Sequence, residues 1–167
     1  MLKIVNSMKE LDFSGLCFVY AERICENGRL RYPLESEGMQ NLLAQQDFYS
    51  SLCLFFEDKT AALFYWDIED CCCAALRLEK YNDGYLLNSL ETAPREREKG
   101  CAKALVSETI QYLKSEAPVK LYSHIDNRNY ISISVHTACG FKKILDHAVY
   151  LDGSVLHTSS TYLYEIV

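Results

Sequence analysis

The sequence has no long apolar run, and this absence excludes one large class of proteins. No stretch of about eighteen consecutive apolar residues occurs, so a membrane-spanning helix is not expected. The first residues, MLKIVNSMKELDF, lack the apolar core followed by small residues that marks a secretion signal. We therefore expect a cytoplasmic protein without a membrane partner.

Positive charge is scarce as well. The chain has 17 Lys and Arg residues against 23 Asp and Glu residues, which gives a formal net charge of −6. Counterion release on nucleic acids requires a concentrated basic face, so no nucleic-acid partner is expected. The two best-known nucleotide loops, GxGxxG and GxxxxGK, are also absent.

Cysteine is plentiful, but the spacing that binds metals is missing. None of the 8 cysteines forms a CxxC pair, and no paired histidines accompany them. In a cytosolic protein they are expected to be reduced and to serve as small buried apolar residues. The run 71–73 is unusual, and a thiol-based redox or metal protein built on it is the weakest alternative. We expect no metal site.

The pattern of apolar residues predicts one domain with mixed secondary structure. With 167 residues, 49% of them hydrophobic, the chain is large enough for a single core. Apolar spacings of three and four predict helices over 11–27, 39–56 and 103–115, and ENG is a favourable stop for the first. Asn129 is expected to cap a shorter helix that ends at Cys139 and Gly140.

Strands are expected between and after these helices. Residues 2–5 favour a first strand, and 61–66, 71–80 and 84–93 an antiparallel meander. A further strand is predicted at 119–125, and 141–151 and 158–167 read as a closing hairpin across the loop 152–157. The result is a mixed α/β, or α+β, sandwich.

The segment ETAPREREKGCAKALV changes from an apolar strand through a charged loop into a helix. Unpaired N–H groups and the positive end of the helix dipole make such a helix start suitable for phosphate. Gly100 and Ala102 are small enough to let a pyrophosphate approach the main chain. Positive charge comes from Arg95, Arg97, Lys99 and Lys103. The alternative is a charged surface loop with a tolerated glycine, and this segment alone does not decide between them.

Two motifs resemble those of a known family. Residues 97–102, REKGCA, resemble the R/Q-x-x-G-x-G/A signature of GNAT N-acetyltransferases, with Pro94 in its customary place before them. Residues 129–141, NYISISVHTACGF, look like the family motif Asn-x-x-Ala. In that motif an aromatic residue that acts as the acid follows four residues later, and Gly-Phe closes the helix. The segment 74–94 also looks like uncharacterised bacterial members. The resemblance covers nearly the whole chain and implies a largely antiparallel sheet with a splayed parallel pair, flanked by helices.

The resemblance implies an acetyl-CoA-dependent N-acetyltransferase formed by one domain over 1–167. In the family, the strand corresponding to 84–93 carries a bulge and splays from the strand corresponding to 119–125, with the pantetheine arm between them. Backbone groups around Leu90 and Thr92 would bind that arm, and Asn129 would contact the cofactor near its thiol end. The pyrophosphate would rest on the loop and helix start formed by Arg97, Glu98, Lys99, Gly100, Cys101, Ala102 and Lys103.

The same resemblance implies catalytic residues. A main-chain N–H between Leu90 and Thr92 would stabilise the oxyanion. Most members carry a tyrosine acid seven residues after the motif asparagine, and His136 stands there in this chain. A histidine, with a free pKa of about 6.5, can donate a proton, or it can simply pack in the helix. Glu91 is the leading candidate for the base, acting through a water; the alternative is a surface carboxylate, because a bulge leaves the strand phase open.

Four further residues are weaker candidates. His124 and Asp126 end the second splayed strand and could bind substrate or relay protons, or merely finish the strand and start a turn. His147 and Tyr150 are candidates for a pocket wall.

The acceptor is expected to be a primary amine of a small molecule or peptide, and the acidic charge favours a cationic one. A CoA-binding module without turnover, serving as a sensor or interaction domain, is the alternative function. A homodimer through an exposed edge of the aromatic last strand is a further expectation.

Overall fold

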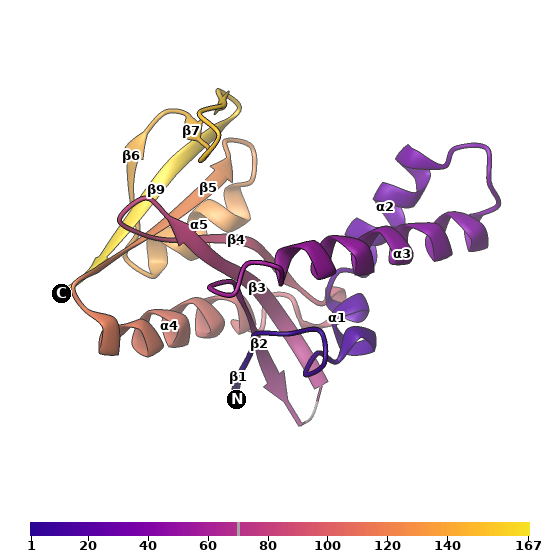
Figure 1. The fold of residues 1–167 in the computed structure, drawn as a ribbon, viewed down its shortest axis with the longest axis horizontal. Coiled ribbons are helices and arrows are strands. Elements are labelled where there is room, and N and C mark those ends of the chain that lie inside the picture. Colours follow the sequence, from indigo (N-terminus) through magenta and orange to yellow (C-terminus); the bar gives the residue numbers. More distant parts are fainter. Residues whose placement is uncertain (70) are drawn as a thin grey trace.

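The structure, a computed structural model, describes residues 1–69 and 71–167. Seven strands form one sheet in the order β1-β2-β3-β4-β5-β9-β6, and helices cover both faces (Figure 1). The strands of this sheet are β1 (Leu2–Val5), β2 (Ala62–Ile68), β3 (Cys71–Tyr81), β4 (Gly84–Thr92), β5 (Val119–Asp126), β6 (Lys142–Leu145) and β9 (Ser159–Ile166). The helices are α1 (Phe13–Val19), α2 (Ala21–Arg31), α3 (Glu37–Phe55), α4 (Cys101–Leu113) and α5 (Tyr130–Ala138), with 3-10 turns η1 (Pro94–Glu96) and η2 (Lys114–Glu116). The predicted mixed fold with a parallel pair is confirmed.

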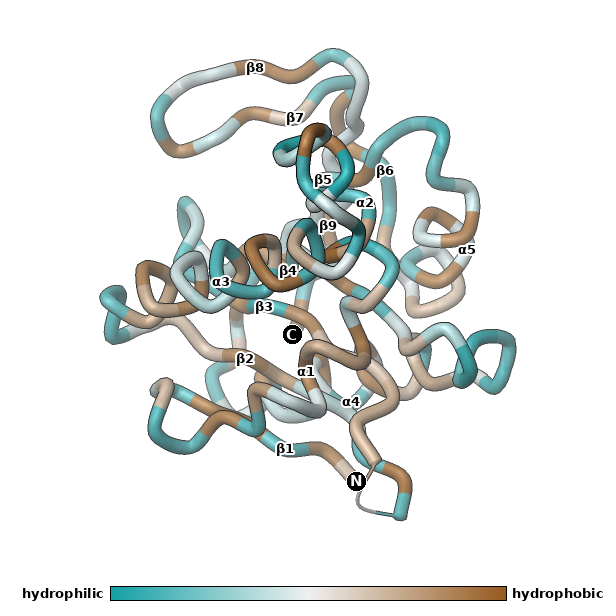
Figure 2. Tube along the Cα trace, turned by 90° about the vertical axis from the view of Figure 1, so that its right-hand side faces the viewer, coloured by the Kyte–Doolittle hydropathy of each residue, from teal (hydrophilic) through white to brown (hydrophobic). Residues whose placement is uncertain are grey.

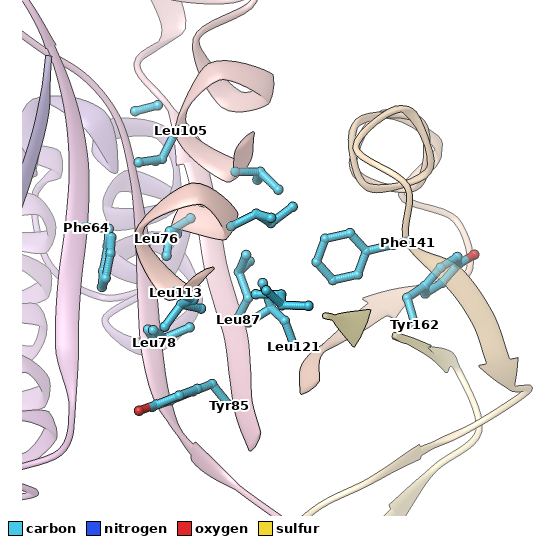
Figure 3. Close-up of a cluster of buried hydrophobic side chains, with 14 of the residues drawn as sticks. Phe64, Leu76, Leu78, Tyr85, Leu87, Leu105, Leu113, Leu121, Phe141 and Tyr162 are labelled. Carbon is cyan, nitrogen blue, oxygen red and sulfur yellow. The ribbon is translucent and has the colours of Figure 1, made fainter. Parts of the chain in front are cut away.

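The sheet separates two hydrophobic cores. On one face, Leu105 and Leu113 of α4 pack over Leu76 and Leu87 of the sheet (Figure 3). On the other face, α1, α2 and α3 cover a second cluster that includes Leu52. Strand side chains alternate between the two faces, so β3 contributes to both clusters. Figure 2 shows the corresponding pattern, with apolar residues in the central strands and hydrophilic residues in many connecting loops.

The predicted meander is confirmed, but the predicted closing hairpin is only partly right. Strands β2, β3 and β4 pair antiparallel in succession, and β6 pairs antiparallel with β9. However, β7 (Ala148–Val149) leaves the sheet and pairs with β8 (Val155–Leu156), inside the segment predicted as a loop. Because β9 also pairs with β5, both its edges are occupied and the expected exposed edge for dimer formation is wrong. The homodimer itself stays a prediction.

The single helix predicted over 11–27 is wrong, because the chain forms two helices that meet at Tyr20. The second helix also continues through Asn27 and Gly28 to Arg31. Gly28 is buried against α3, and a Cβ on it would lie 2.7 Å from the carbonyl oxygen of Gln40. The glycine therefore permits a close helix–helix approach and is not a stop signal here.

Strands β4 and β5 form the parallel pair, and they stay together only briefly. Pairing extends over Gly84–Leu86 with Lys120–Tyr122, and no pairing between these strands follows in the part of the chain that the structure describes. Gly84 makes the start of the pair possible, because a Cβ there would lie 1.9 Å from a carbonyl oxygen of β5. On its other side, β4 carries a bulge against β3, where Ser89 has a φ of 53°. The expected splay and bulge are confirmed.

Candidate functional site

The divergence of β4 from β5 leaves an open strand edge. Beyond Leu86, the edge of β4 that faces β5 has no strand partner among the described residues, so its backbone groups, apart from the carbonyl of Ser89, have no strand to pair with. The hydroxyl of Tyr20 donates a hydrogen bond to the carbonyl of Ser89, and this contact stabilises the bulge. Such an edge can bind an extended chain of amide groups as an added strand. Leu90 and Thr92 lie on this stretch of β4.

The loop after β4 ends in a row of unpaired N–H groups. The first amide of α4 to find a backbone acceptor is that of Ala104, which donates to the carbonyl of Gly100 at 2.9 Å. Within the described residues, the N–H groups of 98–103 have no protein acceptor. Gly100 caps the helix with a φ of 82°, and a Cβ on it would meet nothing within 4 Å. The glycine is thus required by the left-handed backbone, and the space above it is open to an anion.

The basic residues of this loop are only partly directed at that space. Arg97 pairs with Glu22 of α2 at 2.7 Å and approaches Glu91 at 3.5 Å. Lys99 pairs with Glu96 at 3.0 Å. A phosphate on the loop would therefore compete with carboxylates for these two cations. Among the described residues, no ion pair is recorded for Arg95 or Lys103.

Glu91, the candidate base, is half-buried at the far end of the bulge. Its side chain is 27% exposed, and one carboxylate oxygen accepts a hydrogen bond from the N–H of Thr92 at 3.3 Å. The same oxygen faces Arg97. The structure thus brings two of the predicted site residues together, one from β4 and one from the loop. The catalytic role of Glu91 stays a prediction.

His136, the candidate acid, lies in the core between α5 and β5. It is 1% exposed, its Nε2 is 3.1 Å from the hydroxyl of Ser123, and its Nδ1 is 2.8 Å from the carbonyl of Ser132. The Phe141 ring packs against it with centroids 5.0 Å apart, and burial lowers its pKa. Both ring nitrogens are occupied within the protein. This position favours a structural role, and a catalytic role would require the contact with Ser123 to open.

Asn129 and Asp126 organise the turn between β5 and α5. The side chain of Asn129 accepts from the N–H of Ser132 at 3.0 Å, so the predicted helix cap is confirmed. Asp126 accepts from the N–H of Arg128 at 2.8 Å, and the neighbouring guanidinium lowers the pKa of its carboxyl. Asp126 therefore finishes a strand and starts a turn, while contact of Asn129 with a cofactor stays a prediction.

A groove lies on the face of the sheet opposite α4. Its volume is about 240 Å³, and Tyr81, Leu86 and Tyr150 are among its lining residues. Tyr150 thus lines a groove, and its place in the wall of an active-site pocket stays a prediction. His147 does not line this groove, and its ring lies 5.9 Å from that of His157 in the hairpin. His124 packs directly against two of the lining tyrosines.

Comparison with known proteins agrees with this geometry. The family model described as the acetyltransferase (GNAT) family matches residues 24–141, well over half of the chain. The chain belongs to the GNAT acetyltransferase family. No curated protein matches it in sequence. Among the described residues, no helix is both long enough and apolar enough to cross a membrane.

Solved structures show the same fold at low sequence identity. The PaiA N-acetyltransferase of Thermoplasma acidophilum, in complex with coenzyme A, is 15% identical with a TM-score of 0.67, covering 99% of each chain. The ribosomal-protein-alanine N-acetyltransferase of Brucella melitensis is 17% identical with a TM-score of 0.64, covering 98% of this chain and 99% of its own. An N-acetyltransferase of Staphylococcus aureus is 15% identical with a TM-score of 0.63, covering 100% and 99%.

Sequence reasoning about this GNAT chain missed three polar residues beside the splay. Tyr20 lies within the segment 11–27 that is predicted as one helix, yet its hydroxyl reaches the bulge. Glu79 and Asn88 face one another across β3 and β4, where the amide of Asn88 donates to the carboxylate. Burial raises the pKa of Glu79. Period-two alternation places Glu79 on one face of β3, but only the strand register pairs it with Asn88.

A cluster of possible metal ligands lies at the loop between β4 and α4. The Sγ atoms of Cys73 and Cys101 and a carboxylate oxygen of Glu96 lie within 4.8 Å of one another. Burial raises the pKa of Cys73 to about 11, which keeps that thiol protonated at neutral pH. Lys99 already pairs with Glu96. Both features oppose metal binding, and the absence of a resident metal stays a prediction.

Proposed function

We propose that the protein is an acetyl-CoA-dependent N-acetyltransferase that acts on a primary amine of a small molecule or peptide. The observation that carries this proposal is the row of free N–H groups over residues 98–103, beside the open edge of β4. The loop suits a pyrophosphate because its amides are unpaired at a helix start with open space over Gly100. The edge of β4 suits the amides of a pantetheine arm.

Coenzyme A, when bound, supplies an acetyl group activated as a thioester. The protein's own contribution is to orient that group and to stabilise charge. An N–H between Leu90 and Thr92, where β4 bulges, would donate to the oxyanion. Glu91 would receive the amine proton through a water, with Arg97 beside it. His136 would act as the acid only if its contact with Ser123 opens.

The alternative, a CoA-binding module without turnover, is favoured by one observation. The residue in the place of the usual tyrosine acid is buried and has both nitrogens occupied. A module of this kind would bind acetyl-CoA and acetylate no amine. An assay with a panel of amines separates the two functions. Product formation in this assay is monitored through the release of the free thiol of CoA.

Calorimetric titration with acetyl-CoA, CoA and adenosine 3′,5′-bisphosphate tests the phosphate site, using Gly100→Glu and Gly100→Gln as a matched pair. Both variants place an L side chain at a φ of 82°, so they share the backbone strain. Only the first adds a negative charge beside the phosphates. We expect Gly100→Glu to weaken binding by well over tenfold relative to Gly100→Gln, that is by more than about 1.4 kcal/mol.

Circular dichroism checks that both variants are folded. Equal affinity of the two folded variants for all three ligands would refute the phosphate-loop assignment. Failure of the wild-type protein to bind any of the three would refute both the transferase and the binding-module functions.

A further inference from the structure

On the face of the sheet opposite α4, one half-buried imidazole has no hydrogen-bond partner in the part of the chain that the structure describes. His124 lies on β5, and neither its Nδ1 nor its Nε2 has a hydrogen-bond partner among the described residues. Both nitrogens are shielded from solvent. Buried polar groups in native proteins are nearly always hydrogen-bonded, because an unsatisfied one is destabilising. An unpaired imidazole therefore points to a partner that the protein itself does not supply.

Tyrosines enclose this imidazole. The rings of Tyr81 and Tyr150 meet it edge-on, with centroid distances of 5.3 and 5.1 Å. Tyr81 is held in place, because its hydroxyl donates to the carbonyl of Val149 and its ring packs against that of Tyr122. Tyr150 is 40% exposed and lies between β7 and β8. Of the two rings, Tyr150 is the one that can turn away and admit a ligand.

The same two tyrosines wall the groove of about 240 Å³. Its lining is completed by Leu86, Leu151, Glu79, Lys80 and Asp152. The ammonium of Lys80 lies 3.8 Å from the ring centroid of Tyr85, which packs in the core on the α4 side of the sheet. The volume is below the roughly 300–1,000 Å³ of sites for drug-sized ligands, so it fits a small molecule. Aromatic and leucine side chains suit an apolar body.

The groove also adjoins the point where β4 leaves β5. Leu86 is the last residue of β4 that pairs with β5, and its partner is Tyr122. Two residues further on, Asn88 and His124 lie at corresponding positions of the diverging strands and, by alternation, on the same face as that pair. The nitrogen of an amine bound near His124 would thus reach the splay from the face of the sheet opposite α4.

We propose that this groove is the acceptor site, that it takes a small primary amine with an apolar body, and that His124, in place of Glu91, is the catalytic residue that accepts a proton from the reacting nitrogen. The inference rests on the transferase function proposed above. The apolar body lies between Tyr81 and Leu151, and the amine replaces the ring of Tyr150 beside the imidazole. The carboxylates of Glu79 and Asp152 along the groove attract the ammonium form of the substrate.

The proposed transfer conserves protons and electron pairs. The alkylammonium transfers one proton to the neutral imidazole nitrogen of His124, and the freed lone pair attacks the thioester carbonyl carbon. A C–N bond forms, the C–S bond breaks, and the departing thiolate takes a second proton from the nitrogen. The imidazolium then releases its proton to solvent, so the products are the amide, the thiol and one proton.

The surroundings keep His124 in the form that can accept a proton. Burial lowers its pKa, so the ring is neutral at pH 7. The titratable groups that face it are Tyr81 of β3 and Tyr150 after β7. Glu79 and Asp152 line the adjoining groove, and Tyr122 lies on the same strand.

Steady-state kinetics with acetyl-CoA and an amine panel tests the inference. The panel contains phenethylamine as the apolar amine, putrescine as a dication and a short peptide with a free N-terminus. We expect the highest kcat/KM for phenethylamine. His124→Phe keeps a ring between the tyrosines and should lower kcat by about 10²–10⁴-fold. Its affinity for acetyl-CoA, measured by calorimetry, should not change, and its Tm should be no lower than that of the wild type.

A second variant, Leu151→Ser, tests the groove separately from the proton transfer. It should raise KM for phenethylamine several-fold with little change in kcat. An unchanged kcat in folded His124→Phe would overturn the role of His124. Preference for putrescine or the peptide would overturn the proposed substrate class, although the transferase function would stand. Acetyl-CoA binding without turnover of any amine would overturn the transferase function and this inference together.

Discussion

At the scale of single residues, burial decides which chemistry a side chain can perform. His124 and His136 are both histidines near the splay, and burial lowers the pKa of each. His136 has both nitrogens bonded within the protein, whereas His124 has neither bonded to any residue that the structure describes. The difference lies in the neighbours: Ser123 and Ser132 surround one ring, and tyrosine rings surround the other.

The buried histidines should make stability depend on pH. A depressed folded-state pKa means that the unfolded chain binds more protons as pH falls below about 6.5. Stability is therefore present above that pH and is lost as pH falls towards the folded-state pKa. For one histidine the slope should reach up to about 1.4 kcal/mol per pH unit. Urea unfolding at a series of pH values should show a shallower slope for His136→Leu than for the wild type.

Substitution of the exposed His157 by Gln is the matched control for the loss of one imidazole. At pH 7, His136→Leu should also lower the free energy of unfolding by about 1–3 kcal/mol, because the hydroxyl of Ser123 loses its partner. If the slope is the same in wild type and His136→Leu, the burial argument is wrong. A loss of kcat beyond about a hundredfold in the folded variant would instead support the catalytic role predicted for His136.

At the scale of elements, glycines set how closely two segments approach. Gly28 of α2 meets the main chain of α3, whereas Gly38 of α3 has open space where a Cβ would be. Gly28→Ala should therefore lower the free energy of unfolding by about 1–3 kcal/mol through overpacking. Gly38→Ala should raise it by up to about 1 kcal/mol through helix propensity.

Denaturant unfolding of the two variants measures this difference directly. The pair is matched because both positions are helical glycines and neither has a positive φ. A Gly28→Ala variant as stable as the wild type would show that α2 and α3 can separate without loss. That result would contradict the close approach of the two helices.

At the scale of the whole molecule, one sheet serves two cores, and this should make folding cooperative. Strands β2 and β3 contribute side chains to the clusters on both faces. We therefore expect a single transition, with Trp66 fluorescence and far-UV circular dichroism changing together. At a CoA concentration a hundredfold above Kd, the free energy of unfolding should rise by about 2.7 kcal/mol.

The pair α2 and α3, which extends beyond the sheet in Figure 1, is the part that could depart from this behaviour. Two separate transitions would show that the helices unfold independently of the sheet, and the single domain expected over 1–167 would then be wrong. Calorimetry decides between one and two cooperative units, because the calorimetric enthalpy of unfolding equals the van't Hoff enthalpy only for one unit.

The sequence by itself determined the features that arise from neighbouring residues. The cap at Asn129, the helix start after Gly100 and the meander are local, because propensity, capping and alternation act over a few positions. The two motifs around Gly100 and Asn129 were sufficient to indicate the family for the same reason.

The tertiary structure alone decided which distant groups meet. Four features depend on a partner far away in the chain. They are the ion pair of Arg97 with Glu22, the burial of His136 against Ser123, the departure of β7 from the sheet, and the position of Gly28 inside a helix. Local patterns carry no information about such a partner. The unpaired imidazole of His124 belongs to the same class, because its lack of a partner is a property of the packed molecule.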